Sequence, residues 1–130
     1  MIVDTSALIA ILRQEDEAGI ISEAIGKSAN VSISAATWFE AAIVADRFQD
    51  RTVGRRFDTL CREMKLAIVP MDETQARIAR EAYRDFGKGS GHKAQLNFGD
   101  CFAYALAKAM NEPLLYKGTD FSHTDVRPAL

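Results

Sequence analysis

Cysteine and histidine are scarce in this sequence. Its 130 residues include only two cysteines, Cys61 and Cys101, which stand far apart and belong to no CxxC pair or Cys/His cluster. Neither a disulfide framework nor a zinc site is therefore indicated, and the cysteines are predicted to be reduced packing residues. The two histidines, His92 and His123, are not expected to bind a metal ion.

Long hydrophobic runs are also missing. The longest nearly apolar stretch, residues 35–45, contains Thr37 and Glu40 and is much shorter than the ~20 residues that a membrane-spanning helix needs. The first residues lack the basic and apolar regions of a signal peptide. We therefore expect a cytoplasmic protein with no membrane partner.

The overall composition is that of an ordinary globular protein. Hydrophobic residues make up 48% and charged residues 26% of the chain, so neither disorder nor a fibrous class is indicated. The length predicts one domain over residues 1–130. The formal charge of −2 at first argues against a nucleic-acid partner, but four carboxylates committed to metal would leave the remaining surface at about +2.

Short apolar runs alternate with amphipathic stretches along the chain. Strands are predicted at residues 2–3, 31–33, 67–69 (buried) and 114–116; helices are predicted at 7–12, 20–25, 35–49, 53–65, 73–86 and 100–110. Ser6 and Ser34 are expected to cap the first and third helices. The Gly-rich residues 87–93 are predicted to form a loop. This order predicts a three-layer α/β/α fold with a mainly parallel sheet.

Four acidic residues lack an obvious charge partner. Most other acids have a cation at helical spacing, such as Glu81, four residues after Arg77. Glu40 instead has only uncharged helical neighbours, Ala36, Thr37, Ile43 and Val44. Asp100 is similar, although an acid in the first turn of a helix also stabilises that helix. Asp4 and Asp120, each taken alone, would be turn or capping residues.

The predicted topology brings these four acids together. In a parallel sheet, ligands bind beyond the carboxyl ends of the strands; Asp4 ends the first strand and Asp120 follows the last. Glu40 and Asp100 lie in helices that can project toward the same edge. Four such carboxylates repel one another unless a hard cation such as Mg²⁺ or Mn²⁺ binds them. Ions held in this way can promote attack of water at phosphorus, which indicates a nuclease.

Four segments resemble the PIN domain, and within it the VapC toxins of bacterial toxin–antitoxin modules. They are residues 3–8 (VDTSAL), 38–42 (WFEAA), 96–107 (LNFGDCFAYALA) and 114–121 (LLYKGTDF). The resemblance implies an endoribonuclease that uses Mg²⁺ or Mn²⁺ and cleaves structured RNA, commonly tRNA or rRNA. It also implies a homodimer and a cognate VapB-type antitoxin whose C-terminal segment lies across the active site.

The resemblance also implies the roles of individual residues. Asp4 and Asp100 would hold the principal metal ion, and Glu40 and Asp120 would complete its shell directly or through water. Thr5 or Ser6 could orient a water or a phosphate oxygen.

Two further groups of residues carry separate expectations. Lys88, His92 and Lys93, in the Gly-rich loop before Asp100, are predicted to help hold the RNA backbone. The aromatic residues Phe98, Phe102 and Tyr104 are predicted to pack in the core instead of stacking on bases.

Three alternatives are open to comparison. A haloacid-type phosphatase needs a second aspartate two residues after the first, where this chain has Ser6. A receiver-type signalling domain needs a phospho-acceptor in mid-chain, and residues 67–70 (AIVP) offer none. A catalytically inactive PIN-like RNA-binding scaffold is disfavoured by the complete set of acids, and a cleavage assay decides it.

Overall fold

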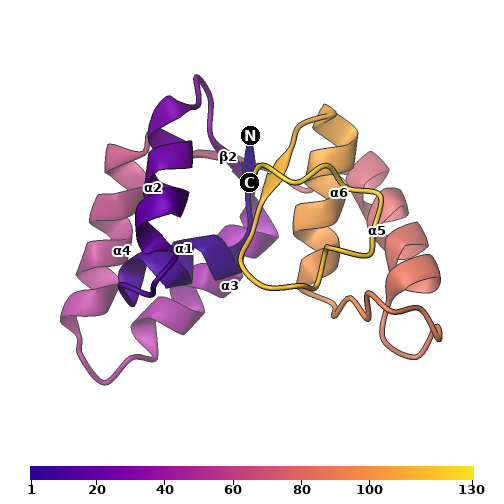
Figure 1. The fold of residues 1–130 in the computed structure, drawn as a ribbon, viewed down its shortest axis with the longest axis horizontal. Coiled ribbons are helices and arrows are strands. Elements are labelled where there is room, and N and C mark those ends of the chain that lie inside the picture. Colours follow the sequence, from indigo (N-terminus) through magenta and orange to yellow (C-terminus); the bar gives the residue numbers. More distant parts are fainter.

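A parallel four-stranded sheet forms the middle layer of the computed structural model, which describes residues 1–130 (Figure 1). Its strands are β1 (Ile2–Val3), β2 (Ser32–Ser34), β3 (Ala67–Val69) and β4 (Leu114–Leu115), in the order β3-β2-β1-β4. The helices are α1 (Thr5–Leu12), α2 (Ala18–Lys27), α3 (Ala35–Asp46), α4 (Thr52–Glu63), α5 (Glu73–Phe86) and α6 (Asp100–Met110). The predicted three-layer α/β/α fold is confirmed.

Helices cover both faces of the sheet because successive strand residues point to opposite sides. Ile2 and Leu114 join the buried cluster formed with α5 and α6. Val3, Ile33 and Leu115 join the cluster formed with α1 to α4. Figure 1 shows the two groups of helices on opposite sides of the strands. Since all strands run the same way, their carboxyl ends meet at one edge of the sheet.

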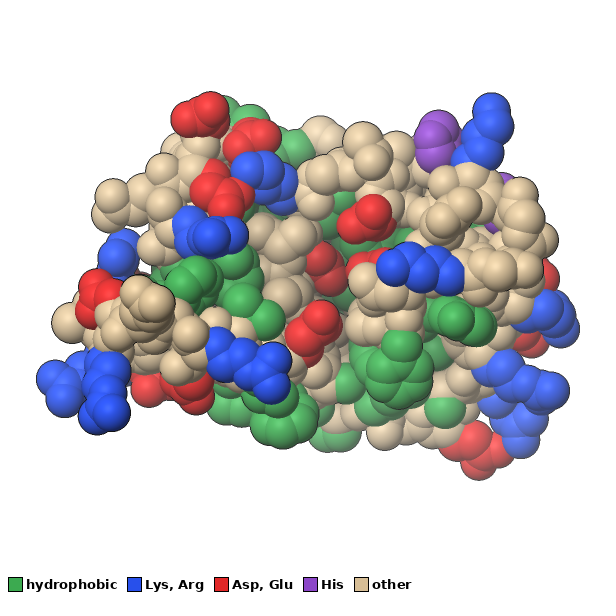
Figure 2. Space-filling view, turned by 90° about the horizontal axis from the view of Figure 1, so that it is seen from below, with side chains coloured by type: hydrophobic (Ala, Val, Ile, Leu, Met, Phe, Trp, Pro, Cys, Tyr) green, Lys and Arg blue, Asp and Glu red, His purple; other side chains and the backbone are tan.

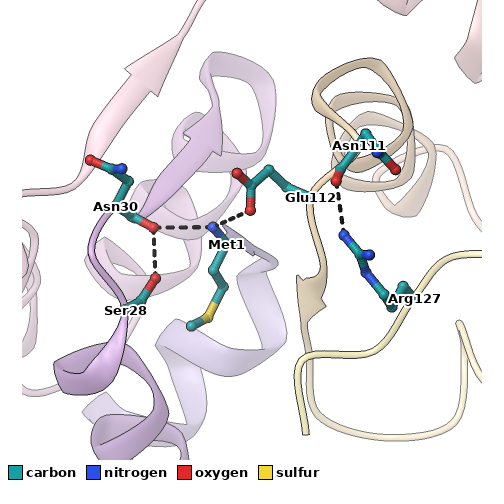
Figure 3. Close-up of polar contacts among 6 residues, drawn as sticks. All are labelled: Met1, Ser28, Asn30, Asn111, Glu112 and Arg127. Carbon is teal, nitrogen blue, oxygen red and sulfur yellow. Dashed lines mark hydrogen bonds and ion pairs between the residues drawn. The ribbon is translucent and has the colours of Figure 1, made fainter.

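The amino ends of three strands are tied together at the opposite edge (Figure 3). The amino group of Met1 donates to the carbonyl oxygen of Asn30, at 3.1 Å, and pairs with Oε2 of Glu112, at 2.8 Å. Met1, Asn30 and Glu112 precede β1, β2 and β4. The chain termini and loops at this edge therefore fix the strands without occupying the edge where the acids lie.

Some predicted boundaries and contacts were wrong. Asp4, not Ser6, caps α1, because Oδ2 of Asp4 accepts the Ser6 N–H at 2.9 Å. Helix α3 ends at Asp46, three residues earlier than predicted, and β2 lies one residue later. Arg77 pairs with Glu73 instead of Glu81. No helix of the structure combines the length and the apolar character needed to cross a membrane.

The predicted burial of β3 was also wrong. This strand is the outer strand of the sheet, and the side chain of Ile68 is 48% exposed. An apolar run of three residues looks the same in a central strand as in an edge strand, because its neighbours are set by the tertiary fold.

Candidate metal centre

The four acids predicted from the sequence lie at the carboxyl edge of the sheet. Asp4 follows β1, Glu40 lies on α3, Asp100 begins α6, and Asp120 lies in the loop after β4. None of them forms an ion pair with a lysine, arginine or histidine. Figure 2 shows acidic side chains near the middle of this face, with lysine and arginine side chains to either side.

Asp4 is held in place by the start of α1. Its Oδ2 accepts hydrogen bonds from the Ser6 backbone N–H, at 2.9 Å, and from the Ser6 hydroxyl, at 2.6 Å. The Ser6 Oγ in turn accepts the backbone N–H of Lys117 at 3.0 Å. Ser6 therefore joins the end of β1 to the loop after β4. Asp4 itself is 5% exposed, so burial fixes its orientation as well.

Glu40 reaches the same edge from the second turn of α3. Its Oε2 accepts the Thr5 hydroxyl at 3.2 Å, and that hydroxyl also lies 3.3 Å from the Thr37 carbonyl oxygen. On its other side stands Gly99, where an added Cβ would lie 2.8 Å from Oε2 and 2.9 Å from Oε1. The backbone of Gly99 is in the ordinary helical region. Glycine therefore leaves room here for the Glu40 carboxylate, and its conformational freedom is not used.

Asp100 combines a capping role with a site role. Its Oδ2 accepts the Asn97 N–H at 2.7 Å, and the Asp100 N–H donates to Oδ1 of Asn97 at 2.9 Å. This reciprocal pair is a capping box that fixes the start of α6. The hydrogen bonds of Asp4, Glu40 and Asp100 each engage one carboxylate oxygen, so the second oxygen remains available as a ligand.

The loop that carries Asp120 is fastened to α6. Next to Asp120, the buried ring of Phe121 packs against Tyr116, with centroids 5.0 Å apart. Farther along, Asp125 accepts the hydroxyl of Tyr104 at 2.5 Å and pairs with Lys108 at 2.9 Å. Tyr104 and Lys108 belong to the helix that begins at Asp100, so the segment after Asp120 is fastened to the middle and the last turn of α6.

The electrostatics of the site are those of carboxylates crowded without a cation. Burial is the main cause that raises the pKa of Asp4, opposed by the hydrogen bonds from Ser6. Partial burial likewise raises the pKa of Glu40, and the charge of Asp4 adds to it. The pKa of Asp100 rises from 3.8 to about 6, first through burial and then through the charges of Asp4, Asp120 and Glu40.

These residues fit a hydrated divalent ion. No three His, Cys, Asp or Glu side chains are gathered closely enough to hold one ion by themselves. Mg²⁺ is typically bound through one or two carboxylates and keeps several waters, so it does not need three direct protein ligands. The buried hydroxyls of Ser34 and Thr37, at the end of β2 and the start of α3, have no hydrogen-bond partner. A site built from carboxylate and hydroxyl oxygens favours Mg²⁺ or Mn²⁺ over softer metals.

The residues predicted to contact substrate lie in two regions, beside the site carboxylates and in the loop before Asp100. The hydroxyls of Thr5 and Ser6 both hydrogen bond to site carboxylates. In the loop before Asp100, Lys88 and Lys93 are exposed. His92 is half-buried: its Nδ1 accepts the Ala94 N–H at 3.1 Å, and its ring packs edge-on against Phe86.

The predicted packing of the aromatic residues was only partly right. Tyr104 is buried, but Phe98 is 76% exposed and packs only edge-on against the half-buried Phe102. Phe98 precedes α6 in a turn, so that helix does not hold its side chain against the core. The sequence alone gives no sign that Gly99 makes room for Glu40, because this role depends on a contact with α3.

Comparison with known proteins agrees with this fold. The PIN domain family model matches residues 1–127. The chain is 52% identical to Ribonuclease VapC28 of Mycobacterium tuberculosis, covering 100% of this chain and 98% of the relative. It is 45% identical to Ribonuclease VapC42 of the same species, covering 99% and 98%.

Solved structures share the fold at low sequence identity. The VapC20 toxin of M. tuberculosis, described as cleaving the sarcin-ricin loop, superposes with a TM-score of 0.71 at 16% identity, covering 98% of each chain. VapBC2 of Rickettsia felis gives 0.75 at 16% identity, covering 98% of this chain and 94% of the other. The parallel sheet and the acids at its carboxyl edge accompany a match to the family model over residues 1–127. The chain therefore belongs to the PIN domain family, within its VapC branch.

Proposed function

We infer that the chain is a divalent-metal-dependent endoribonuclease and the toxin of a type II toxin–antitoxin module. The observation that carries this inference is the set of four carboxylates from separate elements at one sheet edge, three of them with a raised pKa and none with a cationic partner. The relatives at 52% and 45% identity are named as ribonucleases. An inactive RNA-binding scaffold has no need for such a costly cluster.

Each acid has a separate task in this proposal. Asp4 and Asp100 would hold the ion, while Ser6 and Asn97 keep one oxygen of each carboxylate in place. Glu40 and Asp120 orient water, and Thr5 holds Glu40. When bound, Mg²⁺ or Mn²⁺ supplies Lewis-acid chemistry that makes water easier to deprotonate and offsets charge on the phosphate.

The direct test is cleavage of purified tRNA and rRNA by the purified chain, with and without Mg²⁺, followed by sequencing of the new 5′ ends. Cleavage at defined positions that EDTA stops and Mg²⁺ restores supports the proposal. Binding of RNA without cleavage under any metal would favour the inactive scaffold.

The proposal includes two protein partners, a VapB-type antitoxin and a second copy of the chain. Solved neighbours include a toxin–antitoxin complex from Klebsiella pneumoniae and VapBC2 of R. felis. Phe39 and Phe98, which are 62% and 76% exposed, offer apolar surface that a homodimer contact could cover. Analytical ultracentrifugation of the chain alone, and with the antitoxin encoded beside it, tests both partners.

Gly99→Ala should damage the site without unfolding the protein. The added methyl group would meet the carboxylate of Glu40 at 2.8 Å, and the end of a flexible side chain moves more easily than backbone does. Displacing this acid should lower RNA cleavage by about 10- to 100-fold. The control is Gly26→Ala, since a methyl group there meets nothing within 4 Å. Wild-type cleavage by Gly99→Ala, with an unchanged melting temperature, would show that Glu40 need not occupy its present position.

Lys88 and Lys93 should contribute to RNA binding through charge. If both contact phosphates, replacing them with alanine should make log K less steep in log [salt] by about 0.7 to 0.9 per lost contact. The measurement is fluorescence anisotropy of labelled tRNA over a KCl series in EDTA. An unchanged slope in the double variant would place the loop outside the RNA footprint.

A further inference from the structure

A cluster of arginines lies at the far ends of the two helices that carry Asp4 and Glu40. Helix α1 starts next to Asp4, and Arg13 is its C-cap; α3 carries Glu40, and Arg47 is its C-cap. The two ends meet, because the Arg13 guanidinium lies 5.3 Å from the centre of the Phe48 ring. Helix α4 begins five residues after Arg47, at Thr52, and its first turns add further arginines. The arginine cluster comprises Arg13, Arg47, Arg51, Arg55 and Arg56.

Most of this charge has no partner within the protein. Arg13 has one weak ion pair, 3.7 Å to Glu15, and the other four arginines have none. All five side chains are exposed. Residues 46–56 contain four arginines and two aspartates, so they carry a formal +2 in a chain whose total is −2. Arg77 on α5, in contrast, pairs with Glu73.

Helix stability accounts for Arg13 and Arg47, because they are the C-caps of α1 and α3, where a cation is favourable. It does not account for the arginines at the start of α4. Arg51 and Arg55 flank the first turn of α4, which contains no acidic residue. The N-terminus of a helix carries partial positive charge, so cations there are unfavourable. Asp50 compensates in part by accepting the Thr52 N–H. The arrangement breaks a local rule for helices, and such exceptions are expected where a residue serves binding.

The cluster also lies within reach of the carboxylates. Arg13 is nine residues from Asp4 along α1, and Arg47 is seven from Glu40 along α3, which corresponds to about 10–14 Å. A nucleic-acid strand covers that distance in about three to four nucleotides, at roughly 3.4 Å of axis each in a duplex. Figure 2 shows lysine and arginine side chains on the same face as the central acidic side chains, on the side where α1 and α4 lie in Figure 1.

We propose that the arginine cluster binds RNA backbone phosphates, with Arg13 and Arg47 about three to four nucleotides away from the phosphate that is cleaved. The proposal rests on the ribonuclease function proposed above and extends it to a second contact region. Arginine suits the task because its planar fork binds phosphate in a bidentate way and keeps its charge. Phosphate contacts of this kind set the register of the RNA on the enzyme but carry no sequence information.

The test compares two variants that remove the same charge. Arg51→Gln with Arg55→Gln removes two arginines of the cluster; Arg62→Gln with Arg77→Gln removes two others, from the last turn of α4 and from α5. Binding of labelled unfractionated tRNA is measured in EDTA over a KCl series. The cluster variant should show a slope of log K against log [KCl] that is shallower by about 1.4 to 1.8. The control should keep the wild-type slope, and both variants should remain folded by far-UV circular dichroism.

Two outcomes would overturn the proposal. An unchanged slope in the cluster variant would mean that RNA does not contact these arginines, and a protein partner would then be the better explanation of the exposed charge. Equal loss in the two variants would mean that RNA responds only to net charge. The ribonuclease proposal fails separately, if the wild-type chain cleaves no RNA in Mg²⁺.

Discussion

Purified Asp100→Asn protein is expected to cleave RNA at least about 100-fold more slowly than wild type, since loss of even an outer-shell partner at a metal site typically costs 10- to 100-fold. The substitution keeps the size of the side chain. It also keeps one oxygen that can accept the Asn97 N–H, so the capping box at the start of α6 survives. The substitution removes the negative charge and the second carboxylate oxygen, which the NH2 group of asparagine replaces. Asp4→Asn should have a comparable effect.

The control for this experiment is an aspartate outside the site. Asp85 lies on α5 and pairs with Arg84, so Asp85→Asn removes the same charge from the protein without touching the sheet edge. Initial rates in Mg²⁺ and far-UV circular dichroism of the variants are the measurements. Undiminished cleavage by folded Asp100→Asn protein would contradict the assignment of the metal centre. Loss of activity in Asp85→Asn would instead indicate a general effect of charge.

The position of the acids at one sheet edge was predictable mainly through the topology. Glu40 carries a local signal, because its helical neighbours are uncharged, whereas Asp4 and Asp120 are ordinary turn residues until the apolar runs before them are predicted as strands. A parallel topology then requires that all three approach one edge. The alternation of strands and helices was enough to predict the layers of the fold for the same reason, since connections between parallel strands must cross over a face of the sheet.

Other features depend on contacts between distant segments and left no signal in the sequence. Gly99 makes room for Glu40, which is 59 positions earlier in the chain. Asp125 holds the final loop through Tyr104 and Lys108, although it resembles an ordinary loop residue. The exposure of β3 follows from its place at the end of the strand order. Each of these is decided by tertiary packing, which outweighs local pattern.

The raised pKa of Asp100 should make the metal-free protein less stable as the pH rises. Its pKa is 3.8 ordinarily and about 6 in the folded state, so between these values the folded chain binds more protons than the unfolded chain. The contribution of Asp100 to the free energy of unfolding therefore falls as the pH increases from about 4 to about 6, and stays lower above that window. Solvent screening of this half-exposed group reduces the expected loss to about 1–2 kcal/mol.

In EDTA at pH 7, Asp100→Asn should consequently melt at a higher temperature than wild type. Asparagine cannot be ionised, so it removes repulsion with Asp4, Glu40 and Asp120, at the cost of function. Several carboxyl groups elsewhere, including Asp125, have a lowered pKa and act in the opposite direction in both proteins. The informative quantity is therefore the difference between wild-type and variant melting temperatures, which should grow from pH 4 to pH 6.

Added Mg²⁺ should reverse that order. A ligand that binds only the folded state stabilises it by RT ln(1 + [L]/Kd), about 2.7 kcal/mol at 100 times Kd. Wild type should gain this stabilisation because two negatively charged ligands are in place, and Asp100→Asn should gain much less at the same concentration. Differential scanning fluorimetry across a Mg²⁺ titration measures both proteins without any knowledge of the RNA. Equal Mg²⁺-induced shifts would show that Asp100 is not a metal ligand, whatever its effect on cleavage.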